Sequence, residues 1–504
     1  MDRRSFLQGL SLIGASPGLP LYNHVRAADN PPKPLKIIVV GAGLAGLTAG
    51  YELEQKGHTV ALLEADAKHL GGRVRTQRFA NGRYGELGAM RIPKQHDLTR
   101  KYVKAFGLKL RPFVNSNPEA YTVARGKKVR QKDAAQLAAA YKLDLWERGK
   151  SSDALWERAV TEPLKKLTDA ERKDLFAVTP KTPAVRNLDR LSLRQLFQRA
   201  GLSDEAIEYL AVTQSEETLF HTAATEVLRD EVLEVYSQEL DEIVGGLDEL
   251  PRAFAAKLKA KPRTGCEVTE LIQNADRGTV TARYTEGGEE KEVSADYLVC
   301  AIPLSVLGRV KLAPAFSPDK QRAIRQVHYE SATKVLLDCA TRCWEQTDGI
   351  FGGGTITDLP TGMTYYPSDN PTRDAKVSAG PGVLLASYSW GMASRRLAVG
   401  SPEEVVKRTV KHLSAIHPGL AEKGAVLDSA VWNWDTHPWT AGGFAWFLPG
   451  QHTEFHRHLL EPEGRIVLAG EHASLAHSWM QGAIESGLHA VQVILEMSKK
   501  AVPK

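Results

Sequence analysis

The sequence has few cysteines and no long hydrophobic segment after its N-terminus. Its 504 residues include four cysteines, none in a CxxC pair: Cys266, Cys300, Cys339 and Cys343. Histidines at metal-ligand spacing such as HExxH are absent as well, so the sequence predicts no metal site. We expect four buried thiols, with one disulfide as the alternative if the protein is exported. Because no apolar run reaches about 18 residues, we expect no transmembrane helix.

The charge is almost balanced, with 65 basic against 60 acidic residues and a formal net charge of +5. No block of Lys and Arg resembles a nucleic-acid-binding tail, so we expect no nucleic-acid partner. The composition, 42% hydrophobic and 25% charged, is typical of a globular protein. A chain this long is too large for one hydrophobic core and predicts two or three domains.

The N-terminus reads MDRRSFLQGLSLIGASPGLPLYNHVRAADN. Arg3 and Arg4 precede a modestly apolar stretch, and residues 25–27 offer a small-residue cleavage site. This arrangement resembles a bacterial twin-arginine export signal over residues 1–28, the alternative being a disordered basic start. We therefore expect a periplasmic or secreted protein.

A glycine-rich motif follows a buried strand. Residues 37–40 form a continuous apolar run, as expected of a parallel strand covered on both faces. The next residues give GxGxxG, in which Gly41 permits a tight turn, Gly43 admits a pyrophosphate, and Gly46 allows close helix–strand packing. The helix that follows would direct its N-terminal N–H groups at the phosphates.

An acidic residue completes this motif. Residues 59–63 predict the second strand, which ends at Glu64, 18 positions beyond Gly46. An acid at this position binds a ribose hydroxyl, which favours FAD or NAD over NADP. A strand, a glycine loop, a helix and an acid in this order together predict a dinucleotide-binding domain.

The rest of the chain divides into one helical and two strand-rich stretches. Residues 131–235 have apolar residues at helical spacing and little glycine, which predicts a helical insertion. Residues 265–301 read as short strands separated by turns. Residues 326–450 combine aromatic and apolar strands with Gly and Pro, which predicts a mixed sheet.

Further motifs resemble those of the flavin amine oxidase family, which includes monoamine, polyamine and L-amino-acid oxidases. They are GGRVRT at 71–76, GELGAMRIP at 85–93, and the closing segment IVLAGEHASLAHSWMQGAIESGLHAV at 466–491. The resemblance implies FAD as the cofactor. One departure is His69, where the family usually has an arginine.

The L-amino-acid oxidase branch is the most similar, through DEIVGGLDELP, ATKVLLDC, DGIFGGGTITDLP and AGEHASLAHSW. The resemblance implies an α/β fold in which a Rossmann-like FAD-binding domain is joined to a mixed-sheet substrate domain and a helical insertion. It also implies a homodimer. We assign residues 35–80, 236–325 and 455–500 to the FAD-binding domain, 81–130 and 326–454 to the substrate-binding domain, and 131–235 to the helical domain.

The resemblance also implies the flavin contacts. They are Gly41, Gly43, Ala45, Gly46, Glu64, Gly72, Arg73, Gly88, Ala89, Met90, Arg91, Val268, Glu471, Trp479, Met480, Gln481, Gly482 and Ala483.

The family pattern assigns roles around an amino-acid substrate. Arg91 matches the arginine that forks onto the substrate carboxylate, a geometry that suits a guanidinium. Tyr388 matches a second donor to that carboxylate, and Lys334 matches the catalytic lysine that holds a water against the flavin. Trp479 matches an aromatic residue near the flavin, and the backbone carbonyl of Ser478 would accept a bond from the substrate amine.

The expected side-chain pocket differs from that of the snake-venom relatives. Phe444 would form one wall. Ungapped alignment puts Asp230 at a histidine of those relatives, Glu234 at an aromatic residue and Glu330 at an arginine. Trp390 replaces an aliphatic residue. Three acids and an indole predict a basic L-amino acid, arginine first and lysine second.

The implied reaction is oxidative deamination of an L-amino acid by FAD and O₂ to a 2-oxo acid, ammonia and hydrogen peroxide. The alternatives are a flavin amino-acid 2-monooxygenase, which releases an amide and CO₂, and a polyamine or monoamine oxidase. A flavin-bound binding protein without turnover is a further alternative of another class.

Overall fold

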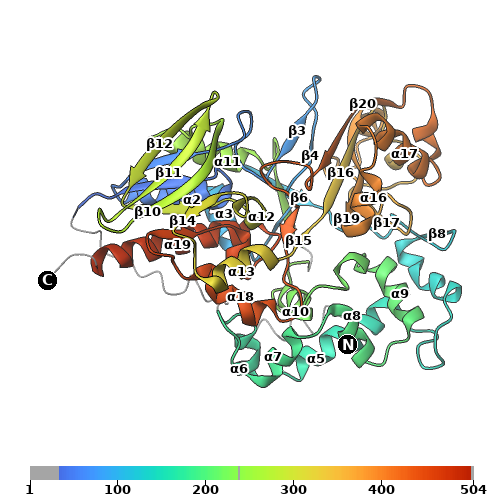
Figure 1. Ribbon diagram of the computed structural model, residues 1–504. Coiled ribbons are helices and arrows are strands. Elements are labelled where there is room, and N and C mark those ends of the chain that lie inside the picture. The colour runs from blue at the N-terminus through green and yellow to red at the C-terminus, as the bar shows by residue number, and fades with distance from the viewer. Residues whose placement is uncertain (1–32, 237–238, 501–504) are drawn as a thin grey trace.

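The structure is a computed structural model that describes residues 33–236 and 239–500. The proposed export signal therefore lies outside the described residues. Figure 1 shows a sheet-rich half at the left, a second sheet at the right, and helices beneath both.

The dinucleotide-binding sheet has four parallel strands in the order β2-β1-β13-β22. Three separate parts of the chain supply them: β1 (Lys36–Val40) and β2 (Thr59–Leu63), then β13 (Tyr297–Cys300), then β22 (Ile466–Leu468). Parallel order is expected because both faces of the sheet are covered and the strands are mostly apolar. The predicted strands at 37–40 and 59–63 are thus β1 and β2.

Helices and a second sheet enclose these strands. α2 (Leu44–Gln55) packs against α19 (Met480–Lys500), and α11 (Glu249–Lys257) lies against α2. The second sheet, in the order β12-β11-β10-β14, comprises β10 (Cys266–Asn274), β11 (Thr279–Glu286), β12 (Glu289–Ala295) and β14 (Lys311–Ala313).

A segment assigned from the sequence to the substrate-binding domain packs against the dinucleotide-binding layer. α3 (Asp97–Ala105) contacts α19, and its Leu98, Tyr102 and Val103 belong to the same buried cluster as Ile37. Beside it, β5 (Ile92–Pro93) and β6 (Leu110–Phe113) flank β9 (Leu240–Ile243) in a small antiparallel sheet. The apolar face of α3 is buried against the apolar side of α19. The local sequence of α3 does not reveal which element covers that face.

The mixed sheet has seven strands in the order β20-β16-β19-β18-β17-β7-β8. α16 (Gly391–Leu397) and α17 (Pro402–Ser414) pack on its β16, β19 and β20 strands. The strands are β7 (Tyr121–Ala124), β8 (Lys127–Arg130), β16 (Ala332–Cys339), β17 (Gly354–Thr357), β18 (Met363–Tyr365), β19 (Gly382–Trp390) and β20 (Val426–Asn433).

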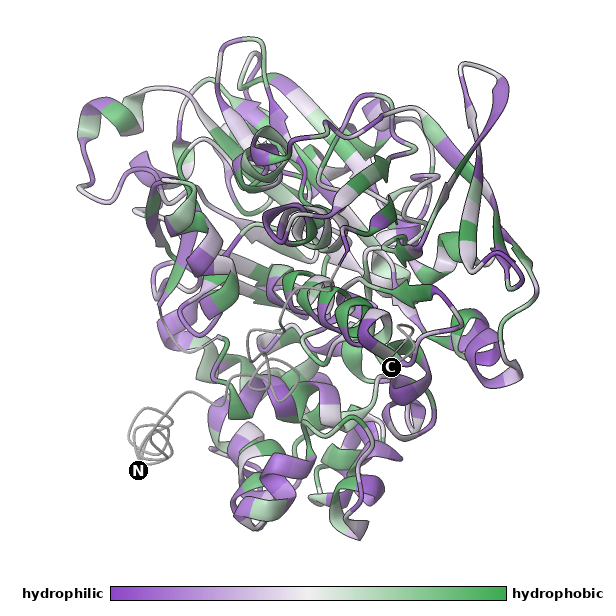
Figure 2. Ribbon diagram, turned by 90° about the vertical axis from the view of Figure 1, so that its left-hand side faces the viewer, coloured by the Kyte–Doolittle hydropathy of each residue, from purple (hydrophilic) through white to green (hydrophobic). Residues whose placement is uncertain are grey.

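The predicted helical insertion consists of short helices. Two of them begin with a capping box, at Thr168 and at Ser192, which satisfies N–H groups that a short helix leaves unpaired. Figure 2 shows hydrophobic and hydrophilic residues side by side on these helices, as expected when one face is buried. They are α4 (Ser152–Trp156), α5 (Glu162–Lys165), α6 (Asp169–Asp174), α7 (Pro183–Asp189), α8 (Leu193–Arg199), α9 (Asp204–Thr213) and α10 (Ala224–Val232).

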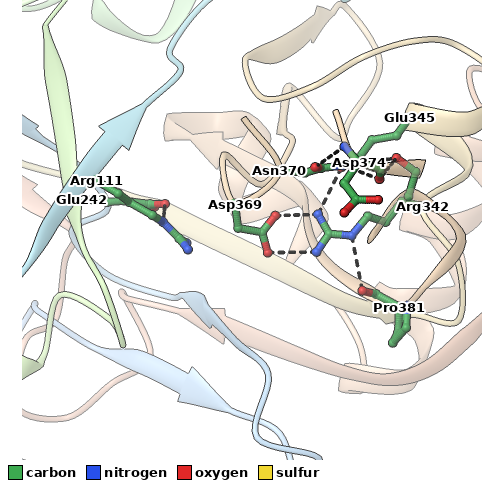
Figure 3. Close-up of polar contacts among 9 residues, drawn as sticks. Arg111, Glu242, Arg342, Glu345, Asp369, Asn370, Asp374 and Pro381 are labelled. Atoms are coloured by element: carbon green, nitrogen blue, oxygen red, sulfur yellow. Dashed lines mark hydrogen bonds and ion pairs between the residues drawn. The ribbon is translucent and has the colours of Figure 1, made fainter. Parts of the chain in front are cut away.

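A buried ion network anchors the loops at the end of the mixed sheet. The guanidinium of Arg342 donates to Asp369 at 2.9 Å, to Glu345 at 3.0 Å and to the carbonyl of Pro381 at 3.3 Å. Figure 3 shows this fork, with Asp369 facing two nitrogens of the guanidinium. The protein itself therefore neutralises this arginine.

All four cysteines are free; Cys266, Cys300 and Cys339 are buried, as expected from the sequence, whereas Cys343 is half-buried. Among the described residues, no helix combines the length and apolarity that a membrane crossing requires.

Candidate active site

One cavity runs from the glycine loop after β1 to the mixed sheet. Most of the residues predicted to contact the flavin or the substrate line it: Gly41, Gly43, Ala45, Glu64, Gly72, Arg73, Gly88, Ala89, Met90, Arg91, Val268, Lys334, Tyr388, Trp390, Phe444, Glu471, Ser478, Trp479, Met480 and Ala483.

The glycine loop leaves room for a ligand. A Cβ added to Gly43 would meet no atom within 4 Å, so glycine at this position is not required by protein packing. Gly41 has a φ of +99°, a conformation that suits glycine. Because α2 begins directly after Gly43, its N–H groups face the same cavity. A pyrophosphate fits this loop, where the backbone must be approached closely.

Glu64 is fixed at the end of β2. Its carboxylate accepts N–H bonds from Ala42 at 2.6 Å and from Asp66 at 2.8 Å. Burial raises the pKa of Glu64 despite these bonds. The side chain lines the cavity where a ribose hydroxyl would lie.

The closing segment is held by a buried acid. Glu471 pairs with Arg73 at 2.7 Å and accepts N–H bonds from Ser478 at 2.9 Å and from Ala445 at 3.1 Å. Ser478 has a φ of +64°, a strained conformation that this bond stabilises. Glu471 thus fixes the backbone of Ser478 and the start of α19 beside the cavity.

Three predicted flavin contacts do not line the cavity, because packing within the protein occupies them. A Cβ at Gly46 would lie 1.9 Å from the carbonyl oxygen of Gly41. A Cβ at Gly482 would lie 2.2 Å from that of Ala476. Gln481 accepts the N–H of Thr99 at 3.0 Å in α3. These residues position the elements that form the cavity.

Arg91 carries a buried charge without an acidic partner. It is 9% exposed, and its Nη1 donates to Asn115 at 2.5 Å and to the hydroxyl of Tyr365 at 3.2 Å. The ring of Tyr236 lies 5.3 Å from the guanidinium carbon. No carboxylate in the described part of the chain forms an ion pair with it. Because a buried cation requires compensation, the site is suited to an anion.

Lys334 and Tyr388 are cross-strand partners on β16 and β19. Lys334 is 1% exposed and donates to the carbonyl of Gly88 at 2.6 Å and to that of Glu86 at 3.2 Å. Its ammonium lies 4.4 Å from the centre of the Tyr388 ring. Burial lowers the pKa of Lys334 to about 7 and raises that of Tyr388 to about 12.

Aromatic rings form much of the remaining wall. The ring of Trp390 packs edge-on against Tyr388 and against Phe444, with ring centres 5.1 Å and 5.5 Å apart. The ring centres of Trp479 and Tyr236 are 5.6 Å apart. Such a wall excludes water and can stack on a flat or cationic group.

The three acids predicted for the side-chain pocket do not converge. The carboxyl of Asp230 lies near the Trp479 indole and the Tyr236 ring, both of which line the cavity. Burial, and to a smaller extent the negative charge of Glu226, raises the pKa of Asp230 to about 8.

None of the three acids is among the cavity-lining residues: Asp230 lies behind Trp479 and Tyr236, and Glu234 and Glu330 lie elsewhere. Glu234 has a left-handed backbone (φ +52°) in the turn after α10, and its carboxyl lies near that of Glu231. Glu330 accepts the N–H of Ser331 and lies against His328 and His221. An ungapped alignment gives position but not side-chain direction.

Sequence reasoning did not identify three residues that bind or cover Arg91: Asn115, Tyr236 and Tyr365. They come from three distant parts of the chain and lie in no motif. Trp446 lines the cavity as well, and the aromatic spacing of GGFAWF was the only signal for it.

The parallel sheet, the open glycine loop and the acid at the end of β2 define a dinucleotide-dependent oxidoreductase. A family model described as flavin containing amine oxidoreductase matches residues 44–495, and the chain belongs to that family. Its cofactor is FAD, which the residues of the cavity fit. The sequence-based predictions of the fold class, the cofactor and enzymatic activity are confirmed.

Relatives are similar over nearly the whole chain. An L-amino-acid oxidase from Siganus canaliculatus is 34% identical over 477 residues, covering 94% of this chain and 86% of its own. One from Vipera ammodytes ammodytes is 32% identical over 486 residues, covering 95% and 96%.

Solved structures share the fold at lower identity. Putrescine oxidase bound to putrescine superposes with a TM-score of 0.73 at 18% identity, over 92% of this chain and 99% of its own. Cyclohexylamine oxidase from Brevibacterium oxydans gives 0.71 at 18%, over 93% and 100%.

Proposed function

We propose that the protein is an L-amino-acid oxidase. The observation that carries this proposal is Arg91, a buried guanidinium that faces the cavity and is held by an amide and a phenol rather than by an acid. A substrate carboxylate would supply the missing charge through a bidentate contact. An amine without a carboxylate would leave the guanidinium uncompensated.

The residues around Arg91 contact different groups of the substrate. Tyr388 donates a second hydrogen bond to the carboxylate, and the carbonyl of Ser478 accepts one from the amine. Trp390, Phe444 and Trp479 exclude water and orient Cα. When bound, FAD supplies the hydride acceptor and the reaction with O₂. Lys334 holds a water at its ammonium, beside the carbonyls of Gly88 and Glu86.

We propose a basic side chain for the substrate, arginine first and lysine second. Trp390 offers a face on which a planar guanidinium stacks, an interaction of about 0.5–2 kcal/mol. Of the three acids considered, Asp230 is the one whose carboxyl lies next to Trp479 and Tyr236, two rings that line the cavity. A cationic substrate favours its ionised form and is bound by it.

A panel of L-amino acids tests both parts of the proposal. The purified flavoprotein is assayed for peroxide with each amino acid, and the organic product is identified. We expect arginine and lysine to give the highest kcat/KM and a 2-oxo acid as the product. Faster turnover of leucine or phenylalanine would contradict the basic pocket.

Product identity separates the remaining reactions. An amide with CO₂ would indicate a 2-monooxygenase instead. Turnover of amines that lack a carboxylate, such as putrescine or agmatine, would indicate an amine oxidase.

We also propose export by the twin-arginine route and a homodimer. Fusion of residues 1–35 to a reporter that is active only after export tests the first, with Arg3→Lys/Arg4→Lys as the control. Light scattering on the purified protein tests the second, and a monomer mass would contradict it.

A further inference from the structure

Three metal-ligating side chains meet outside the cavity. They are His221, His328 and Glu330, whose nearest ligand atoms all lie within 4.8 Å of one another. Glu330 lies in β15 (Tyr329–Glu330), and His221 lies between η3 (Glu217–Leu219) and α10. We propose that these three residues form a binding site for one zinc-type divalent cation.

The mutual distances match a metal centre. His221 Nε2 lies 3.2 Å from His328 Nε2, and Glu330 Oε2 lies 3.3 Å from His328 Nε2 and 3.5 Å from His221 Nε2. Zn²⁺ binds nitrogen and oxygen at about 2.0–2.1 Å, so the edge of its coordination tetrahedron is about 3.3 Å. All three edges are close to that value.

Neighbouring groups orient the ligands. The second oxygen of Glu330, Oε1, accepts the N–H of Ser331 at 3.1 Å, which leaves Oε2 for the centre. The ring of His221 also hydrogen-bonds the backbone of Thr218. Backbone contacts of this kind fix the direction of the ligands and the tautomer of the imidazole in metal sites.

The site is accessible on one side and closed on the other. The side chain of His221 is 49% exposed and that of Glu330 is 2% exposed. The protein therefore supplies three ligands, and water can supply the fourth from the exposed side. Arg395 is nearby, but it pairs with Asp435 at 3.7 Å and donates to the hydroxyl of Ser331 at 2.8 Å. Its charge is partly compensated away from the proposed centre.

Two His and one carboxylate select the kind of ion. Imidazole ligands suit Zn²⁺, Ni²⁺ and Cu²⁺, whereas Mg²⁺ and Ca²⁺ prefer oxygen ligands alone. The ion would link the helical insertion, through His221, to β15. Because Glu330 is the register partner of Phe444 on β21 (Phe444–Ala445), that link reaches the wall of the cavity. The site does not depend on the proposed reaction.

Zinc binding to the purified flavoprotein is the test. After chelator treatment and desalting, the protein is titrated with Zn²⁺, and bound metal is counted after equilibrium dialysis. We expect one Zn²⁺ per chain and a rise of several degrees in Tm, since a ligand that binds the native state stabilises it. Glu330→Gln and His221→Ala should each weaken binding about 100-fold or more, with an unchanged flavin spectrum.

His412→Ala, on α17, is the matched control and should bind zinc like the unmodified protein. Co²⁺ bound in place of Zn²⁺ should give the intense visible bands of a tetrahedral ion, and Glu330→Gln should abolish them. No bound zinc, or binding that both ligand variants retain, would overturn the proposal. In that case the three side chains form a hydrogen-bonded cluster only.

Discussion

Two buried arginines in this protein have opposite surroundings. Arg342, at the end of the mixed sheet, forms ion pairs with Asp369 and Glu345 (Figure 3). Arg91, beside the cavity, has an amide, a phenol and an aromatic ring instead. The two residues are similarly buried, Arg342 at 5% and Arg91 at 9% exposure. The difference therefore lies in the charge around them.

The comparison separates a structural arginine from a binding arginine. A buried cation that the protein neutralises holds elements together, whereas one left with neutral partners is suited to a charged ligand. The same criterion applies to Asp230, whose pKa burial raises to about 8. It applies in part to Lys334, which donates to two carbonyls but also interacts with the buried carboxyl of Glu86. Four predictions test it.

The largest expected effect is that of Arg91→Met. Removal of the carboxylate's partner should cost about 3–5 kcal/mol, which is roughly 10²–10⁴-fold in kcat/KM for an L-amino acid. Thermal stability should be unchanged or higher, because an uncompensated buried charge is lost. Steady-state kinetics and a melting curve measure both, and a large loss of stability would assign Arg91 a structural role.

Arg342→Met should have the reverse pattern. It leaves the Asp369 and Glu345 carboxylates without their cation, so we expect unfolding to become easier by about 3–5 kcal/mol. Denaturant titration measures this loss. The kcat/KM per bound flavin should remain that of the unmodified protein, and a selective loss of turnover would break the comparison.

Lys334→Met should slow the reaction with O₂ by about 100-fold, because one positioned cation is lost. Burial lowers the pKa of Lys334 to about 7, so the ammonium is charged below that pH and neutral above it. In the unmodified protein, kcat/KM for O₂ should fall as the pH rises through about 7. The variant should lack this dependence; an unchanged profile would exclude Lys334 as its source.

Asp230→Asn should have the smallest effect, a loss of roughly ten-fold in preference for arginine over leucine. Because the pKa of Asp230 is raised to about 8, the carboxyl is neutral at lower pH. The preference of the unmodified protein for arginine should therefore increase as the pH rises toward about 8. Competition assays with both amino acids measure it, and equal effects on both substrates would exclude Asp230 from the pocket.

Much of the architecture could be predicted from local patterns. The apolar run before GxGxxG and the acid after the next strand predict β1, β2 and the dinucleotide site, because those features follow from covered parallel strands. Residues 265–301 predict the β10–β13 strands for a different local reason, because alternating residues and turn residues are typical of short antiparallel strands such as β10, β11 and β12.

Side-chain direction could not be predicted in the same way. Glu330 aligns with an arginine of the snake-venom relatives, yet it lies with His221 and His328. Only tertiary packing brings those two histidines together. The partners of Arg91 come from positions 115, 236 and 365, which no spacing rule connects. The packing of α3 on α19 is likewise a tertiary contact that no local pattern indicates.

The central claim is that Arg91 selects a substrate by its carboxylate. The most direct measurement is the loss of flavin absorption without oxygen, with L-arginine and with agmatine, which lacks only the carboxylate. We predict that L-arginine bleaches the protein rapidly and that agmatine at the same concentration leaves it yellow. Bleaching by agmatine at an equal or higher rate would contradict the account.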